Sequence, residues 1–182
     1  RQGLDGADLY QAPEGPLSRP DTVNEILTGS GLVASSVLPQ VFGDRAWQRG
    51  SIAAADPEIR KKAMALIRQN IDFNATPVGK PSVNLWLGQD GFDYPLQTDY
   101  TKQWDYLVKS VRELADYNPE VNLTLEGKIR EPRNRCLVDT TMTALLVCME
   151  VDRKNVGVAI DTGHVFQAQQ SVAQNIEVAA RY

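Results

Sequence analysis

The chain has 182 residues, a formal net charge of −4 at pH 7, and 42% hydrophobic and 23% charged residues, which is an ordinary globular composition. It contains no run of about 18 apolar residues and no basic segment followed by an apolar one, so we expect neither a membrane partner nor a secretory signal. Phosphate backbones are bound by basic surfaces, so the pI of about 5.1 argues against a nucleic-acid partner. We expect a cytoplasmic protein that acts on small, neutral or weakly charged molecules.

Strands and helices alternate along the chain. Short apolar stretches predict strands at residues 6–10, 32–38, 82–87, 121–125 and 156–160. Apolar residues at helical spacing, with capping residues or proline before several of them, predict helices at 21–29, from 57 to at least 71, at 99–117, 136–151 and 171–182. A long loop covers residues 39–57, and another follows the strand at 82–87.

This alternation predicts about five βα units in tandem and therefore a parallel α/β sheet. The strands read as mostly apolar, which is typical of parallel strands covered on both faces. The sequence has no GxGxxG after the first strand and no GxxxxGK[ST], so dinucleotide and P-loop folds are disfavoured. The remaining choices are an open doubly wound sheet and a (β/α)₈ barrel. A closed barrel takes roughly 250 residues. We expect residues 1–182 to be a single domain, and if the fold is a barrel, they are too few to close it.

The chain has two cysteines, Cys136 and Cys148. Two cysteines are too few for a disulfide framework. The helix predicted at 136–151 would hold both of them. We interpret them as small buried side chains in a reducing compartment.

Polar side chains follow three of the predicted strands where each strand ends. They are Trp86, Gln89 and Asp90 for the strand at 82–87, Glu126 and Lys128 for the strand at 121–125, and Asp161 and His164 for the strand at 156–160. Catalytic groups of a βα barrel project from the carboxyl ends of its strands. The sequence therefore predicts that these side chains share one cavity.

The types of these residues indicate metal chemistry. Glu126 and Asp161 are oxygen donors that suit a divalent cation such as Mg²⁺ or Mn²⁺. His164, the single histidine of the chain, would face the same cavity if the chain coils after Asp161. Lys128 shares strand parity with Glu126, and a cation beside an oxyanion suits enolate or hydride-shift chemistry on a hydroxy-ketone. A surface Glu–Lys ion pair, a simple turn at 161–164 and a structural histidine remain open alternatives.

Three segments resemble, in order, those of xylose-isomerase-type barrels. Residues 126–133 (EGKIREPR) resemble the E-x-K-P-x-E-P-R segment of that family, with Ile129 at the place of the first proline. Residues 86–94 (WLGQDGFDY) resemble its W-G-G-R-E-G-Y loop, and residues 161–164 (DTGH) resemble its acid-x-x-His strand end. The resemblance is to the sugar isomerase and epimerase branch. It implies a (β/α)₈ barrel with a divalent metal, Mn²⁺ in first place and Mg²⁺ or Co²⁺ as alternatives.

The resemblance also implies roles for individual residues. The implied roles are metal ligands for Glu126 and Asp161, catalytic groups for Glu126, Lys128 and His164, and sugar contacts for Trp86, Gln89, Asp90 and His164. The family takes another histidine and another carboxylate from later strands, so we expect the remaining ligands outside these residues.

The resulting hypothesis is a divalent-metal-dependent sugar isomerase or epimerase, which interconverts aldoses and ketoses or ketose epimers, and which we expect to be a homo-oligomer. A lyase, a dehydratase or a C-glycoside-cleaving enzyme on the same scaffold stays open, as does a non-catalytic barrel subunit. An apurinic endonuclease needs a cluster of histidines and a basic face, so the single histidine and the net charge of −4 argue against it.

Overall fold

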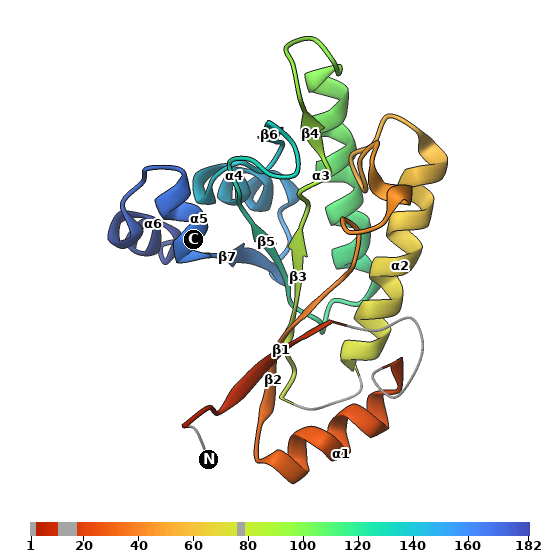
Figure 1. Cartoon of the computed structure of the whole chain (residues 1–182), viewed down its shortest axis with the longest axis vertical. Coiled ribbons are helices and arrows are strands. Elements are labelled where there is room, and N and C mark those ends of the chain that lie inside the picture. Colours follow the sequence, from red (N-terminus) through yellow and green to blue (C-terminus); the bar gives the residue numbers. More distant parts are fainter. Residues whose placement is uncertain (1–2, 11–17, 76–78) are drawn as a thin grey trace.

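The computed structural model describes residues 3–10, 18–75 and 79–182, and its main feature is a five-stranded parallel sheet (Figure 1). The strands of this sheet are β1 (Gly6–Tyr10), β2 (Val33–Leu38), β3 (Ser82–Trp86), β5 (Leu123–Glu126) and β7 (Val156–Ala159). They lie side by side in the order in which the chain makes them, and every neighbouring pair is parallel. This order confirms the predicted tandem βα units.

Helices make the crossovers between these strands. They are α1 (Pro20–Ser30), α2 (Pro57–Ala75), α3 (Tyr100–Tyr117) and α4 (Thr141–Val151), followed after β7 by α5 (Thr162–Gln167) and α6 (Val172–Ala179). A short 3₁₀ helix, η2 (Arg45–Trp47), lies in the long loop before α2. The long helices α2 and α3 stand next to each other on the outer side of the sheet (Figure 1).

The helix starts follow from local sequence. Asp99, Thr140, Asp161 and Ser171 precede α3, α4, α5 and α6, and each side chain accepts a hydrogen bond from the backbone N–H three residues later. Helix α1 ends at Gly31, whose φ of 67° suits a residue without a Cβ. The helices predicted after residues 20, 56, 98 and 170 are therefore confirmed.

The outer face of the sheet forms the hydrophobic core with the helices. Val83, Leu85, Leu123 and Leu125 of β3 and β5 are at most 1% exposed. They pack in one cluster with residues of α2, α3 and α4, among them Ile67, Ile71, Leu107, Val111 and Val147. Each such side chain contributes about 1.5–3 kcal/mol by its burial, so this layer fixes the positions of the strand ends.

The inner face of the sheet is polar, and here the expectation of strands covered on both faces by apolar contacts is wrong. An open hollow of about 410 Å³ lies on this face. Its polar lining comes from alternate strand positions and comprises Asp8, Ser36, Ser82, Asn84, Thr124, Glu126 and Asp161. Because side chains alternate across a strand, β3 and β5 present apolar residues to the helices and polar residues to the hollow.

The helix predicted at 136–151 begins later than expected. Residues Arg135–Cys136 form β6, which pairs antiparallel with β4 (Gly91–Phe92). The strands meet closely at Gly91, where a Cβ would lie 2.1 Å from the carbonyl oxygen of Arg135. Cys136 therefore lies in a loop strand and only Cys148 lies in α4, so the prediction of both cysteines in one helix is wrong.

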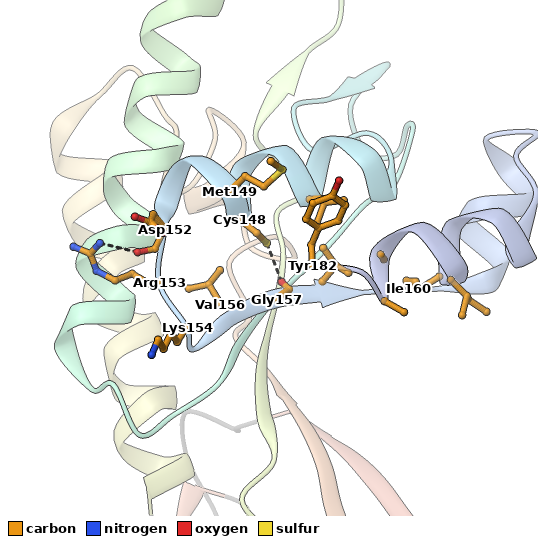
Figure 2. A pocket seen from close by; sticks show the side chains of 14 residues that line it. Cys148, Met149, Asp152, Arg153, Lys154, Val156, Gly157, Ile160 and Tyr182 are labelled. Carbon is orange, nitrogen blue, oxygen red and sulfur yellow. Dashed lines mark hydrogen bonds between the residues drawn. The ribbon is translucent and has the colours of Figure 1, made fainter.

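Beside β7 lies an apolar groove between α4 and α6, which Figure 2 shows with its lining side chains. Its volume is about 570 Å³, and it is lined by Met149, Cys148, Val156, Ile176 and Tyr182 among others. Within the described residues, β7 pairs on one side only, with β5. The groove therefore runs along a free edge of the sheet.

No helix in the ranges 3–10, 18–75 and 79–182 combines the length and the apolar character that crossing a bilayer requires.

Candidate active site and metal centre

The ends of β3, β5 and β7 converge at one rim of the sheet. Trp86 and Glu126 are the last residues of β3 and β5 and are partners in the strand register. Glu126 is also the partner of Ala159, the last residue of β7, and Asp161 follows two residues later. Parallel pairing in this register places three of the predicted strand ends side by side, as the sequence predicted.

Glu126, Asp161 and His164 form a cluster of possible metal ligands. One donor atom from each residue lies within 4.8 Å of the other two. Nδ1 of His164 is 3.1 Å from Oε1 of Glu126, and Nε2 of His164 is 3.7 Å from Oδ2 of Asp161. The side chains of Glu126 and His164 are 12% and 20% exposed, so the cluster is largely enclosed but open on the side of Asp161, whose side chain is 44% exposed.

The start of α5 sets the place of two of these ligands. Asp161 caps α5, and its Oδ1 accepts a hydrogen bond of 2.9 Å from the backbone N–H of His164. The cap turns the chain through one helical turn directly after β7, which brings the imidazole of His164 back over the strand ends. The acid and the histidine therefore reach the same cavity because the cap joins them.

Asn84 is the residue of this site that the sequence reasoning missed. Its Nδ2 donates a 2.5 Å hydrogen bond to Oε2 of Glu126, and its Oδ1 accepts one of 3.2 Å from Oγ1 of Thr124. These bonds hold one oxygen of Glu126 toward β3 and leave the other on the side of His164. The signal in the sequence is the alternation Ser82, Asn84, Trp86, which puts Asn84 on the same face as Trp86.

The environment of Glu126 raises the pKa of its carboxyl group. Burial is the main cause, and the negative charge of Asp161 acts in the same direction. The hydrogen bond from Asn84 and the nearby His164 and Lys128 oppose the rise. Partial burial next to another carboxylate disfavours the charged form of Glu126, and a bound cation would stabilise that form.

The donor set fits a divalent metal ion. Two carboxylates and an imidazole are ligands that Mn²⁺ and related ions accept. Within the described residues, the buried Nδ1 of His164 makes no hydrogen bond of acceptable geometry, although it faces Oε1 of Glu126 at 3.1 Å. Metal–ligand bonds of about 2.0–2.2 Å put donors on one ion up to about 4.4 Å apart. The three donors, all within 4.8 Å of one another, are therefore close to the separation that one ion requires.

Lys128 and Trp86 lie beside this cluster. The Lys128 side chain is 16% exposed, its Nζ is 3.1 Å from Oε2 of Glu131, and it lies 5.3 Å from the centre of the Trp86 ring. The ring of Phe42 meets Trp86 edge-on, with 4.4 Å between ring centres and an interplanar angle of 73°. The two rings form an aromatic wall next to a cation, which suits a ligand with one apolar face and several oxygens.

Gln89 and Asp90 are not part of this cluster. The Asp90 side chain is fully buried, and its carboxylate accepts hydrogen bonds from the backbone of Ser51 (2.7 Å) and Ala53 (3.2 Å) and from the hydroxyl of Ser51. Burial raises the pKa of Asp90, and these hydrogen bonds oppose the rise. The predicted sugar contact of Asp90 is therefore replaced by a structural role, because no face of its carboxylate is open. Gln89 donates a 2.8 Å hydrogen bond from Nε2 to the carbonyl oxygen of Phe42, so it supports the aromatic wall.

The two cysteines lie apart from the cluster. Cys136 is buried and Cys148 half-buried, and both are free thiols. Sγ of Cys136 lies 3.7 Å from the carbonyl oxygen of Gly88, and Sγ of Cys148 lies 3.2 Å from that of Gly157. Burial raises the pKa of each thiol to about 11.

A polar lumen, helices outside the sheet and acidic and imidazole groups at the carboxyl rim define a fragment of a βα barrel with a candidate metal site. The chain belongs to the xylose isomerase-like TIM barrel family, whose model matches residues 3–182. The predicted fold class and the predicted family are thus confirmed.

Individual relatives are sugar isomerases and epimerases. The chain is 26% identical over 149 residues to a xylose isomerase of Ruegeria pomeroyi, covering 77% of this chain and 33% of that protein. It is 25% identical over 136 residues to a D-psicose 3-epimerase of Ruminiclostridium cellulolyticum, covering 72% of this chain and 45% of that one. The chain thus spans less than half the length of these curated relatives.

Solved structures show the same fold. The crystal structure of D-psicose 3-epimerase with D-tagatose from Clostridium cellulolyticum H10 matches with a TM-score of 0.72 and 25% identity, covering 99% of this chain and 61% of that chain. The similarity therefore extends over nearly all of this chain and over part of a longer barrel.

Proposed function

We propose that the protein is a divalent-metal-dependent isomerase or epimerase of small sugars, which interconverts aldoses and ketoses or ketose epimers. The observation that supports this most is the cluster of Glu126, Asp161 and His164 within 4.8 Å at the strand ends. The names of the relatives at 25–26% identity agree with this class of reaction.

Glu126, Asp161 and His164 would hold the metal ion, for which we propose Mn²⁺, with Mg²⁺ or Co²⁺ as alternatives. When bound, such an ion polarises sugar oxygens and stabilises negative charge that develops on them. The remaining ligands would come from segments outside these residues.

The side chains around the cluster supply proton transfer and orientation. Burial raises the pKa of Glu126, which makes its carboxylate a better base toward a proton on a sugar carbon. Asn84 fixes Oε2 of Glu126 by its 2.5 Å hydrogen bond, so Oε1 is the oxygen that faces His164 and the proposed metal position. Lys128 is placed to donate a hydrogen bond to a sugar carbonyl oxygen and so favours charge on that oxygen.

The aromatic wall of Trp86 and Phe42 covers one side of this space. Its rings stand edge to face at 4.4 Å and leave no room for water between them. The apolar face of a sugar ring or chain would lie against it, with the hydroxyl groups turned to the ligand cluster. We propose a small sugar as the substrate. The homo-oligomer and the cytoplasmic location stay predictions from the sequence.

The test measures metal content and turnover in the full-length protein. Purified enzyme is stripped with a chelator, reloaded with Mn²⁺, Mg²⁺ or Co²⁺, and assayed on a panel of aldoses and ketoses. Glu126→Gln and Lys128→Met are compared with Glu120→Gln, an exposed control outside the hollow. We expect stoichiometric metal and turnover in the control, loss of both in Glu126→Gln, and loss of turnover with retained metal in Lys128→Met.

Near-wild-type turnover in both site variants would refute the assignment. Release of a dehydrated or cleaved product would keep the site but replace the reaction by a lyase-type one. A purified protein without metal and without turnover would support a non-catalytic barrel subunit.

A further inference from the structure

Three loops leave the rim of the sheet on the side of Trp86. The first joins β2 to α2 (residues 39–56), the second joins β3 to α3 (residues 87–99), and the third joins β5 to α4 (residues 127–140). All three follow carboxyl ends of strands, so they stand on the same rim as the ligand cluster. Their mutual positions decide where the aromatic wall stands.

Arg133, in the third loop, contacts both other loops with one guanidinium group. It donates from Nη1 to Oδ2 of Asp93 (2.7 Å), from Nε to the carbonyl oxygen of Gln89 (3.0 Å), and from Nη2 to the carbonyl oxygen of Gln48. Its side chain is 16% exposed, so these bonds are largely shielded from water. A planar guanidinium can make several such bonds at fixed angles, whereas the ammonium group of lysine is a single point of contact.

The contacts of Arg133 lead to the aromatic wall in two steps. Gln89, whose carbonyl oxygen Arg133 binds, donates through Nε2 to the carbonyl oxygen of Phe42 at 2.8 Å. Phe42 in turn stands 4.4 Å from the Trp86 ring. A shift of Gln89 would therefore move Phe42, whose ring touches that of Trp86.

The packing behind Trp86 leaves little freedom for such a shift. A Cβ at Gly88 would lie 2.6 Å from the Trp86 ring and 3.1 Å from Cδ of Pro132. The second and third loops therefore close on the ring from behind, and Pro132 directly precedes Arg133. The position of Trp86 depends on the same loops that Arg133 joins.

Other bonds hold the loops together without Arg133. The buried Asp90 ties the second loop to Ser51 and Ala53 of the first. The second and third loops also pair through β4 and β6. Loss of the Arg133 side chain would therefore loosen the loop tips and leave the fold in place.

We propose that Arg133 is a positioning residue, which sets the place of Phe42 and Trp86 through Gln89 and thereby tunes how tightly and how selectively a sugar binds. This inference rests on the proposed function for the identity of the ligand. The coupling between Arg133 and Trp86 does not depend on the proposed function.

The test uses the full-length protein labelled with 5-fluorotryptophan, in which Trp47, Trp86 and Trp104 each give one ¹⁹F signal. The variant Trp86→Phe assigns the signal of Trp86, and Trp104 serves as an internal reference. Arg133→Gln removes the three bonds, Arg133→Lys keeps the charge, and Arg130→Gln removes a charge from an exposed neighbour in the same loop. We expect Arg133→Gln and Arg133→Lys to lose the single sharp Trp86 signal, with the Trp104 signal unchanged, and Arg130→Gln to retain it.

Kinetics then separate positioning from a purely structural role. In Arg133→Gln we expect the KM for the sugar to rise about tenfold while kcat changes less than about threefold, because the wall binds ground state and transition state alike. Metal affinity should stay within about twofold, since Arg133 touches none of the ligands. If Arg133→Gln fails to fold, Gln89→Met cuts the link to Phe42 alone and should give the same Trp86 response in smaller measure.

A wild-type Trp86 signal in Arg133→Gln overturns the inference, whatever the activity of the enzyme. If Arg133→Gln does not fold, a wild-type Trp86 signal in Gln89→Met overturns it instead. An unchanged KM in a protein with an altered Trp86 signal overturns its consequence for sugar binding. A parent protein without sugar turnover overturns the proposed function and leaves the Trp86 response to decide the coupling.

Discussion

The apolar groove beside β7 and the polar hollow on the inner face of the sheet differ in chemistry more than in size. The apolar groove beside β7 is the larger, at about 570 Å³, and the polar hollow on the inner face measures about 410 Å³. The groove gathers aliphatic and aromatic side chains, with Asp152, Arg153 and Lys154 together at one end (Figure 2). The polar hollow gathers donors that converge on one point. Volume and apolar lining therefore mark an exposed apolar surface, and convergent donors mark a candidate site for chemistry.

The two regions also differ in what is energetically unfavourable in each: exposed apolar area in the groove, and a partly buried carboxylate in the polar hollow. Exposed side chains such as Met149 (56% exposed) and Ile176 (49% exposed) leave apolar area in contact with water along the groove. In the polar hollow the raised pKa of Glu126 shows that the folded chain holds a carboxylate in surroundings that disfavour its charge. The pKa of the structural Asp90 is raised as well, and what distinguishes Glu126 is that Asp161 and His164 converge on it.

The largest expected effect is that of Glu126→Gln. The change keeps the size of the side chain and its bond to Asn84 but removes the charge, so metal binding and proton transfer are both lost. We expect turnover to fall by about 10²- to 10⁴-fold, the range that a general acid–base group contributes. Initial-rate assays with Mn²⁺ and isothermal titration calorimetry of the metal measure the two losses separately. Full metal affinity in this variant would show that the ion binds elsewhere.

The cysteines compare the two regions directly, because Cys136 lies in the loop between β5 and α4 and Cys148 lines the groove. Both thiols have a pKa of about 11 in place of 9.0. We therefore expect the native thiols to react at neutral pH about 100-fold more slowly than in the unfolded chain, a factor of ten for each pKa unit. The half-buried Cys148 should be labelled before the buried Cys136, which peptide mapping by mass spectrometry can follow.

These pKa values also give stability a pH dependence. The folded state holds both thiol protons more tightly than the unfolded chain, so their contribution is complete below pH 9.0 and is lost as the pH rises toward about 11. Urea unfolding of the wild type and of Cys136→Ala at pH 8 and pH 10 tests this. An equal loss of stability in both proteins would assign the effect to groups other than Cys136.

A smaller effect is expected from Asn84→Ala, which removes the residue that orients Glu126. The hydrogen bond from Nδ2 of Asn84 to Oε2 of Glu126 is 2.5 Å long. Groups that orient a metal ligand typically contribute 10- to 100-fold in affinity, so we expect a loss of about that size. Asn122→Ala, at an exposed position next to β5, is the matched control. Equal metal affinity in both variants would mean that Asn84 fixes the strand and not the ligand.

Much of the fold was readable from the sequence because its signals are local. The helix predicted at 99–117 and its apolar stripe lie within one segment, and the structure has them as predicted. The strand ends were predictable for the same reason, since parallel strands linked by helices bring their carboxyl ends to one rim. These local signals therefore suffice to predict that Glu126, Asp161 and His164 lie together.

The residues that the sequence misplaced depend on contacts between distant segments. Asp90 looks like a free acid in a loop, and only the folding of the 51–53 backbone around it makes it structural. The pairing of β4 with β6 joins segments more than 40 residues apart, so neither two-residue strand has a periodicity of its own to detect. Treating the strand at 82–87 as apolar on both faces hides Asn84. The alternation of Ser82, Asn84 and Trp86 nevertheless predicts a second, more polar face of this strand.

The smallest expected effect comes from the other side of the comparison, with Ile176→Lys in the apolar groove. The side chain of Ile176 is 49% exposed in α6, so a lysine there can extend its charge into water. We expect the free energy of unfolding to change by no more than about 0.5 kcal/mol. Metal affinity should stay within about twofold of wild type, because no ligand lies in the groove. Calorimetric metal titration and urea unfolding measure both quantities. A tenfold loss of metal affinity would mean that the groove and the ligand cluster communicate through β7 and α5, and the two hollows would then have to be treated as parts of one site.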